Sequence, residues 1–129
     1  FDGDVFGFDR PLGNDGLDEF TTTTTTMVTE IRRGKVENYE VQQTGLGLPL
    51  ANRQDLVGDG PEENAQTIRE VLGGAQTPKR NIVLLNAAFA IMAGGKADHP
   101  KDGLVLAAES IDSGAALDKL DTLAHASRE

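Results

Sequence analysis

The stretch TPKRNIVLLNAAFAIMAGG, which runs from Thr77 to Gly95, decides the fold of this chain. A proline at its second position suits the start of a helix, and the closing pair of glycines ends one. Between these signals the side chains from Ile82 to Ala93 are apolar nearly all round the helix, with Asn86 as the exception. A helix of this kind has to be covered on most of its faces. We therefore predict that it is the central buried helix of the fold.

Helices are also predicted on both sides of this central segment. Upstream, Pro61 starts a run whose next two residues are glutamates, which suit the positive end of a helix, and Gly73-Gly74 ends it. Its predicted buried stripe consists of Ala65, Ile68 and Leu72. Downstream, a helical region extends from residue 100 to residue 125 and is interrupted at Ser113-Gly114. Ser113 is expected to cap the last helix, because a serine hydroxyl there accepts a hydrogen bond from a backbone N–H.

Two strands precede the helices. Residues 27–32 and 35–41 lie on either side of Arg33-Gly34, which predicts a hairpin in which the glycine takes a positive φ. Val28 and Ile31 would then lie on opposite faces of the sheet. Either both faces are partly covered or a bulge intervenes.

A hairpin followed by helices is an α+β arrangement. The 129 residues suffice for one domain with a modest core, and no repeat or linker divides them. Before the hairpin, residues 1–19 are rich in glycine and aspartate and predict an irregular loop. The six threonines from Thr21 to Thr26 favour extended backbone because they are β-branched. The chain begins at Phe1 without a methionine, so we expect a further piece upstream.

Composition narrows the possible partners. The net charge is −9 and the isoelectric point is near 4.6. Binding to nucleic acid or to an anionic membrane relies on clusters of Lys and Arg, which the sequence lacks, so we expect neither partner. The absence of cysteine excludes disulfides, thiolate zinc sites and cysteine nucleophiles, and it fits a reducing compartment. The longest apolar run is too short for a bilayer and the first residues do not resemble a signal peptide, which indicates a soluble, cytoplasmic protein.

The most suggestive chemical feature is the run Asp15-Gly16-Leu17-Asp18-Glu19. On a loop, unlike on a strand, adjacent carboxylates can converge on one cation. Mg²⁺ takes hard oxygen ligands, commonly one or two carboxylates together with water and substrate phosphates. Asp18 and Glu19 are therefore the candidate metal ligands. The alternative is a solvated acidic loop that turns at Asp15-Gly16, and the spacing alone favours this alternative.

The remaining polar residues give weaker indications. His99 and His125 have no partner at the spacing of a metal or catalytic site and are expected at the surface. Asn86 needs hydrogen-bond partners in an apolar helix, and it serves helix packing or reaches a ligand, with packing the better interpretation. No glycine-rich phosphate loop is present, and few basic residues lie near Asp18 and Glu19. We therefore assign no catalytic residue to this chain, because catalysis would require residues from elsewhere.

Taken in order, the motifs of this sequence resemble those of anthranilate phosphoribosyltransferases, an enzyme family of tryptophan biosynthesis. The likeness extends over nearly the whole chain from Asp15 onward. It rests on Gly16-Leu17-Asp18-Glu19, Val28–Lys35, Gly47-Leu48-Pro49, Gly60–Ala65, Leu84–Ala88, Gly95-Lys96-Ala97 and Ser113–Leu117. Each piece is weak on its own, but the shared order of the pieces makes the likeness strong.

The resemblance implies an enzyme that joins anthranilate to the ribose of phosphoribosyl pyrophosphate and releases pyrophosphate with Mg²⁺. In that family, the pair that matches Asp18 and Glu19 helps to hold the metal against the pyrophosphate. The implied fold has a helical N-terminal domain and a larger α/β domain, usually paired as a homodimer through the helical domain. Residues 1–129 would form a single partial domain, the late part of the α/β domain. The family's glycine-rich phosphate loop and anthranilate-binding arginine lie upstream, so this piece alone is expected to be inactive.

The sequence departs from the family in one place and leaves two alternatives open. The family usually has a Val-Val-His-Gly segment before the acidic motif, whereas Val5-Phe6-Gly7 lacks the histidine and Phe8 to Gly13 looks like an insertion. A pyrimidine nucleoside phosphorylase is the nearest enzymatic rival, although the acidic motif and Ser113-Gly114 fit it less well. The chain could instead be a non-catalytic binding or assembly module. An upstream reading frame with a glycine-rich phosphate loop favours the enzyme, and a natural start directly before Phe1 favours the module.

Overall fold

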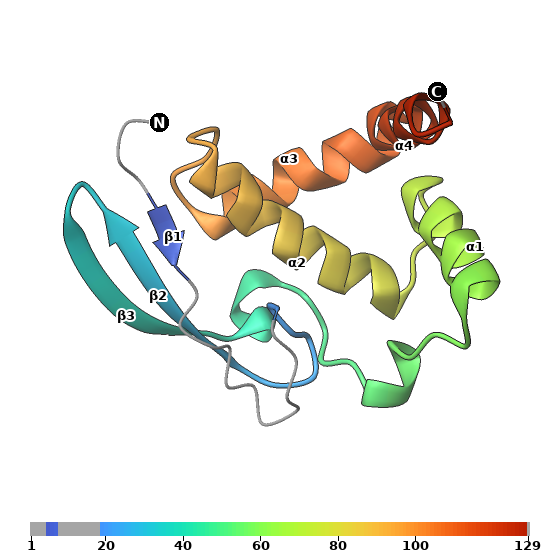
Figure 1. The fold of residues 1–129 in the computed structure, drawn as a ribbon. Coiled ribbons are helices and arrows are strands. Elements are labelled where there is room, and N and C mark those ends of the chain that lie inside the picture. Colours follow the sequence, from blue (N-terminus) through green and yellow to red (C-terminus); the bar gives the residue numbers. More distant parts are fainter. Residues whose placement is uncertain (1–4, 8–18, 129) are drawn as a thin grey trace.

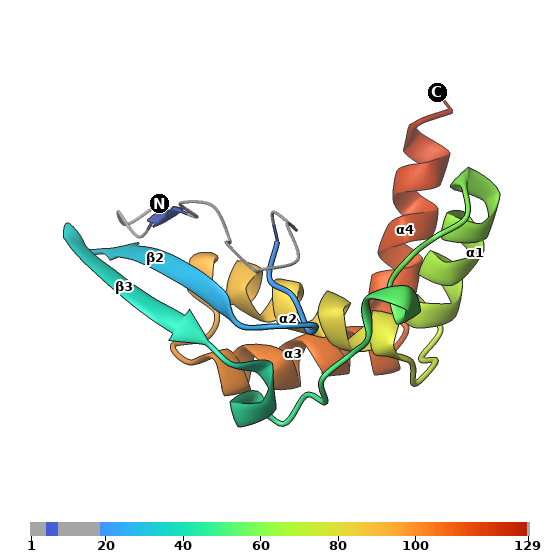
Figure 2. The same cartoon turned by 90° about the horizontal axis from the view of Figure 1, so that it is seen from below.

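In a computed structural model, the chain forms an antiparallel sheet followed by helices, and residues 5–7 and 19–128 are described, the first three as backbone only. The helix α2 (Pro78–Ala93) runs across the middle, between the sheet and α3 (Pro100–Asp112) (Figures 1 and 2). The helices α1 (Pro61–Leu72) and α4 (Ala115–Ala126) lie together at the far end. The predicted α+β arrangement is confirmed. In the described ranges, no helix has the length and apolarity that crossing a bilayer requires.

Helix α2 has the central position that its composition predicts. Thr77 precedes it, and the Oγ1 of Thr77 accepts a hydrogen bond from the backbone N–H of Arg80 at 3.3 Å. The face toward the sheet carries the buried residues Leu85, Phe89 and Met92. A second face packs Leu84 against Ile111 of α3. Burial is therefore confirmed for two faces, whereas Val83 lies exposed on a third.

The strands β2 (Thr26–Arg32) and β3 (Lys35–Val41) form the predicted hairpin. Arg33 and Gly34 connect them in a two-residue turn with φ angles of 50° and 77°. The common two-residue hairpin turn needs a positive φ at both positions, because its twist then matches that of the strands. The turn thus fixes the register of the hairpin.

The sheet has a third strand that the sequence did not predict. The strand β1 (Val5–Gly7) pairs antiparallel with β2, so the strand order is β1-β2-β3. Ile31, which pairs with Val5, is half-buried, and Val28 on the opposite face is only 1% exposed. Both faces are therefore partly covered, and the continuous pairing of β2 with β3 contains no bulge. A three-residue strand has too few alternating positions to be recognised from its pattern.

The prediction of extended backbone along the threonine run is wrong. The chain bends at residues 22–24, and only Thr26 belongs to a strand. The Oγ1 of Thr26 accepts a hydrogen bond from the N–H of Thr21 at 3.2 Å, and the Oγ1 of Thr21 accepts one from the N–H of Thr23 at 3.1 Å. Threonine hydroxyls offer nearby backbone groups an alternative to strand pairing. Here that alternative outweighs β-branching and produces a compact turn before β2.

The predicted buried stripe of α1 is also wrong. Its members are exposed or half-buried: Ala65, Ile68 (48% exposed) and Leu72. The buried residue of this helix is Val71. An exposed ion pair, with Arg69 Nη1 2.9 Å from Asp121 Oδ1, joins α1 to α4. A row of apolar residues shows that one face of a helix is suited to burial, but it does not show that residues of this chain bury it.

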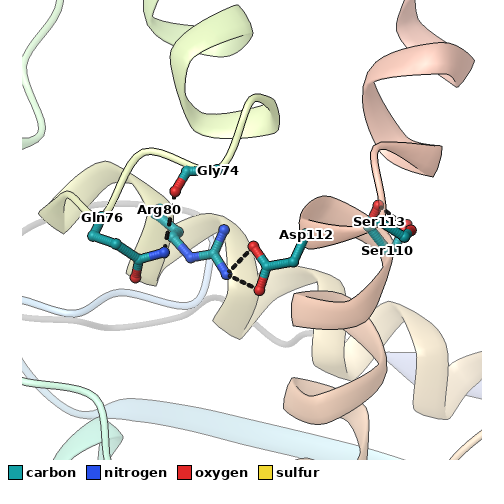
Figure 3. Close-up of polar contacts among 6 residues, drawn as sticks. All are labelled: Gly74, Gln76, Arg80, Ser110, Asp112 and Ser113. Atoms are coloured by element: carbon teal, nitrogen blue, oxygen red, sulfur yellow. Dashed lines mark hydrogen bonds and ion pairs between the residues drawn. The ribbon is translucent and has the colours of Figure 1, made fainter.

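A close backbone contact and an ion pair hold α2 against α3. A Cβ at Gly103 would lie 2.6 Å from the carbonyl oxygen of Ala88, so only glycine fits at this crossing. The guanidinium of Arg80 faces the carboxylate of Asp112, with Nη2 2.9 Å from Oδ1 and 3.0 Å from Oδ2 (Figure 3). Arg80 is only 4% exposed, and a charge so buried requires a partner. The two helices are thus fixed to each other at two separate points.

The helices α3 and α4 separate at Ser113-Gly114, as predicted. Gly114, with a φ of 85°, occupies the position directly before α4. The Oγ of Ser113 donates a long hydrogen bond of 3.4 Å to the carbonyl oxygen of Ser110 (Figure 3). It also accepts one of 3.4 Å from the N–H of Ala115. Gly114, not Ser113, is therefore the residue at the cap position of α4, so the predicted cap is wrong by one position. The Ser113 hydroxyl supports the break from the residue before it.

Tyr39 on β3 makes a polar contact with the neighbouring strand. Its hydroxyl donates a hydrogen bond to Glu30 Oε2 at 2.9 Å, and Arg32 Nε lies 2.9 Å from Glu30 Oε1. Burial raises the pKa of Tyr39 well above its ordinary value, and the hydrogen bond to Glu30 and the charge of that carboxylate raise the pKa further.

We expect this raised pKa to appear as a loss of stability at alkaline pH. Below the ordinary tyrosine pKa of about 10, both the folded and the unfolded chain keep the phenol proton. Above it the unfolded chain loses its proton first, so the free energy of unfolding falls as the pH rises. Tyr39 is the only tyrosine and the chain has no tryptophan, so tyrosinate absorbance reports on this group alone. The titration midpoint should exceed that of free tyrosine, and Tyr39→Phe should reduce the alkaline loss. If Tyr39 titrates at the free-tyrosine value in the folded chain, the result contradicts its buried contact with Glu30.

Candidate functional site

The predicted metal ligands lie just before the threonine turn. Asp18 lies outside the described residues, as do Asp15, Gly16 and Leu17, so the convergence of Asp18 with Glu19 stays a prediction. Glu19 is described, and it lies in a bend with its side chain exposed. A carboxylate in this position is accessible to a hydrated cation from solvent.

The residue after Glu19 is fixed to the central helix by a side-chain amide. The Oδ1 of Asn86 accepts a hydrogen bond from the N–H of Phe20 at 3.1 Å, and its Nδ2 donates one to the carbonyl oxygen of Phe20 at 2.8 Å. The same Nδ2 donates to the carbonyl oxygen of Ile82, one turn earlier in α2, at 2.9 Å. Asn86 thus has the hydrogen-bond partners that its place in an apolar helix requires. These partners join α2 to the loop that carries Glu19.

The side chain of Phe20 provides a second attachment to α2. Its ring stacks on that of Phe89, with the ring centroids 3.8 Å apart and the ring planes 14° from parallel. Phe20 is 2% exposed and belongs to the core cluster between α2 and the sheet, together with Val28 of β2. The two aromatic rings therefore bury much of their apolar surface against each other. Glu19 therefore emerges directly from the core of the protein.

Sequence analysis did not identify Phe20 or Phe89 as part of this site. The available signal was the spacing of Asn86 and Phe89, which are three residues apart and so lie on the same face of a helix. An amide and an aromatic ring on one face of an apolar helix indicate that another segment packs there, with polar groups for the amide and an apolar side chain for the ring. The identity of that segment is not visible from the spacing, because Phe20 and Asn86 are 66 residues apart in the chain.

Other acidic residues are grouped at the start of α1. Asp59, Glu62 and Glu63 line a shallow hollow of about 380 Å³ together with Gly60 and Pro61. Glu62 and Glu63 lie in the first turn of α1, where a negative charge stabilises the positive helix end. Among the described residues, no group of three or more His, Asp or Glu side chains is arranged to hold a metal ion. The helix-end interpretation of these glutamates accounts for their position.

The two histidines lie away from the acidic loop in sequence and at helix ends. His99 directly precedes α3 and makes no side-chain capping hydrogen bond, and His125 lies in the last turn of α4. Both are exposed, as the surface interpretation predicts.

Comparison with known proteins identifies the family of this fold. Residues 12–117 match the family described as the glycosyl transferase family, a/b domain. The chain belongs to this family. Its relatives in the family include anthranilate phosphoribosyltransferases of Acetivibrio thermocellus, 49% identical over 118 residues, and of Rhodospirillum rubrum, 49% identical over 108 residues. These matches cover 89% and 84% of this chain but only 34% and 31% of the two relatives. The chain thus spans about a third of the length of these family members.

Solved structures of the same family share the fold. The anthranilate phosphoribosyltransferase of Thermus thermophilus matches 93% of this chain and 34% of its own with a TM-score of 0.75 and 32% identity. The Saccharomyces cerevisiae enzyme in complex with PRPP and Mg matches 84% of this chain and 32% of its own, with a TM-score of 0.72 and 30% identity. The predicted likeness to this enzyme group is therefore confirmed in sequence and in fold.

Proposed function

We propose that this chain is the C-terminal part of the α/β domain of an anthranilate phosphoribosyltransferase. In the complete protein, the enzyme transfers the phosphoribosyl group of phosphoribosyl pyrophosphate to anthranilate and releases pyrophosphate. The observation that carries this proposal is the 49% identity to the Acetivibrio thermocellus enzyme over 118 residues. Identity at this level over most of the chain favours this activity over that of a pyrimidine nucleoside phosphorylase.

The proposed role of the chain within the enzyme is to hold Mg²⁺ through Asp18 and Glu19. The described part of the site suits this role, because the exposed carboxylate of Glu19 is a hard oxygen ligand on an anchored backbone. Mg²⁺ needs only one or two carboxylates when waters and substrate phosphates complete its coordination. When bound, the metal neutralises charge that develops on the departing pyrophosphate. Binding of the sugar, the phosphates and anthranilate requires residues from the upstream part.

The exposed apolar face of the helices supports a partial domain. A groove of about 570 Å³ is lined by residues of α2 and α3, by the end of α1 and by the start of α4. Its apolar lining includes Leu72, Val83, Ala87, Ala90, Ile91 and Ala116. We assign the cover of this face to the upstream two-thirds of the same protein, because the Acetivibrio thermocellus relative is about three times as long as the segment that this chain matches. The proposed homodimer would form through the upstream helical domain.

A chimera tests the proposed function directly. The matching third of the Acetivibrio thermocellus enzyme is replaced by this chain, and the loss of anthranilate fluorescence is followed with phosphoribosyl pyrophosphate and Mg²⁺. We expect consumption of anthranilate that requires both additions, and no consumption by the 129-residue chain alone. A folded chimera that does not consume anthranilate rejects the proposal and favours a non-catalytic module. A chimera that cleaves pyrimidine nucleosides with phosphate instead would establish the rival enzyme.

A further inference from the structure

We propose that Asn86 is a positioning residue for the metal site, because it fixes the main chain at Phe20 and thereby the direction of the Glu19 carboxylate. The inference rests on the proposed function, since it assumes that Glu19 binds Mg²⁺. It adds a residue of the central helix to that site, although Asn86 itself touches neither the metal nor the substrate.

The hydrogen bonds of Asn86 allow only one orientation of its amide. The Nδ2 group donates to two carbonyl oxygens, those of Phe20 and Ile82, while Oδ1 accepts from the N–H of Phe20. A flipped amide would place an oxygen against two acceptors and an NH₂ group against a donor. The hydrogen bond to Ile82 therefore fixes the orientation of the Asn86 amide on α2. The amide in turn holds the N–H and the carbonyl oxygen of Phe20.

Two side chains of α2 restrain the position of Phe20 independently. Hydrogen bonds to the N–H and the carbonyl oxygen of Phe20 hold its backbone, and the stacked ring of Phe89 holds its side chain. Both restraints come from α2, which is itself fixed to α3 by the close approach of Gly103 to Ala88. A functional loop gains its precision from a rigid element beneath it.

The position of Phe20 determines where Glu19 can lie, because the Cα atoms of adjacent residues are about 3.8 Å apart across one planar peptide. Mg²⁺ requires near-ideal octahedral geometry at short metal–oxygen distances. A loop that drifts would therefore present the Glu19 carboxylate at the wrong distance for much of the time. We infer that loss of the Asn86 amide weakens metal binding even while Glu19 is unchanged.

The test uses Asn86→Asp and Asn86→Ala in the chimera described above. Asp keeps the shape of Asn and its acceptor for the N–H of Phe20, but it places an oxygen where Nδ2 donates. We expect the dissociation constant of Mg²⁺, measured by titration calorimetry with pyrophosphate present, to rise by about 10-fold in both variants. The Mg²⁺ concentration for half-maximal turnover should rise in parallel, with the KM for anthranilate unchanged.

Leu84→Ala is the matched control. Leu84 is buried on another face of α2, in a cluster with Ala107 and Ile111 of α3, whereas Phe20 belongs to the cluster between α2 and the sheet. Its truncation should lower the melting temperature while the Mg²⁺ dissociation constant stays at the parental value. Amide hydrogen exchange gives a second reading, and we expect the amide of Phe20 to exchange faster in the Asn86 variants than in Leu84→Ala.

The outcomes separate this inference from the function on which it rests. If the parent chimera transfers the phosphoribosyl group with Mg²⁺ and the Asn86 variants bind Mg²⁺ as the parent does, Asn86 serves packing alone. If the Asn86→Ala variant does not fold, the Mg²⁺ dissociation constant of the isosteric Asn86→Asp variant decides instead. A Leu84→Ala variant with the same shift in metal binding would also overturn the inference, because the shift would then report general loosening. A parent without transfer activity refutes the proposed function itself.

Discussion

Glu19→Gln in the active chimera is expected to lower turnover by about 10²-fold at low Mg²⁺ and to leave the melting temperature unchanged. The substitution keeps the length of the side chain but removes the charge that a hard cation prefers. Folding is unaffected because Glu19 is exposed and its neighbour Phe20, not Glu19, carries the contacts with α2. Initial rates of anthranilate loss across a range of Mg²⁺ concentrations measure the effect. Asp18→Asn should act in the same direction.

Glu63→Gln is the matched control for this prediction. Glu63 is an equally exposed carboxylate in the first turn of α1, within the acidic hollow that could be mistaken for a cation site. Its substitution should leave the Mg²⁺ dependence at the parental level. If Glu63→Gln shifts that dependence and neither Asp18→Asn nor Glu19→Gln does, the metal assignment belongs to the hollow instead of the acidic loop.

Phe89→Ala is expected to destabilise the 129-residue chain by about 3–5 kcal/mol, the range for removing a fully buried aromatic side chain. Phe89 is 1% exposed, belongs to the cluster between α2 and the sheet, and stacks on Phe20. Its removal opens a cavity and takes away one of the two restraints on Phe20. Because small domains have an unfolding free energy of about 5–15 kcal/mol, this loss is a large fraction of the total. Urea unfolding followed by circular dichroism measures the change.

Ile68→Ala provides the comparison for Phe89→Ala. Ile68 is 48% exposed on α1, so we expect a change of less than about 0.5 kcal/mol in this chain. A loss close to that of Phe89→Ala would mean that the predicted stripe of α1 is buried after all. In the chimera the same substitution should cost more than in the chain alone, because the upstream part is proposed to cover exposed apolar faces of these helices.

The sequence predicted correctly those helix ends and turns that depend on neighbouring residues in the chain. Proline and glycine at the two ends of α2 define its limits, and the Arg33-Gly34 turn defines the hairpin. The same reasoning was wrong for the threonine run, where hydroxyl groups bind nearby backbone N–H groups and outweigh the preference for extended chain. It was also wrong for the stripe of α1, because burial depends on what lies opposite and not on the helix itself.

The metal ligands of the candidate site stay a prediction from the sequence. The run of carboxylates made Asp18 and Glu19 candidate metal ligands, but its spacing alone favoured a solvated loop, and the family resemblance implied the metal role. Their common geometry stays a prediction because Asp18 lies outside the described residues. The contact of Asn86 with Phe20 was not predictable, since it joins positions 66 residues apart by an amide whose partners are backbone groups. Backbone groups are present at every residue, so no residue type in the sequence marks them as partners.

Because Gly103 lies so close to Ala88, even the small substitution Gly103→Ala should have effects far from residue 103. A single methyl group at Gly103 would push against the carbonyl oxygen of Ala88, from which it would be 2.6 Å away, and would force α2 to shift. Phe89 is the next residue along α2, so the shift would pass through its ring to Phe20 and from there to the acidic loop. Gly103, which has no side chain, thereby influences the position of the distant Glu19 carboxylate.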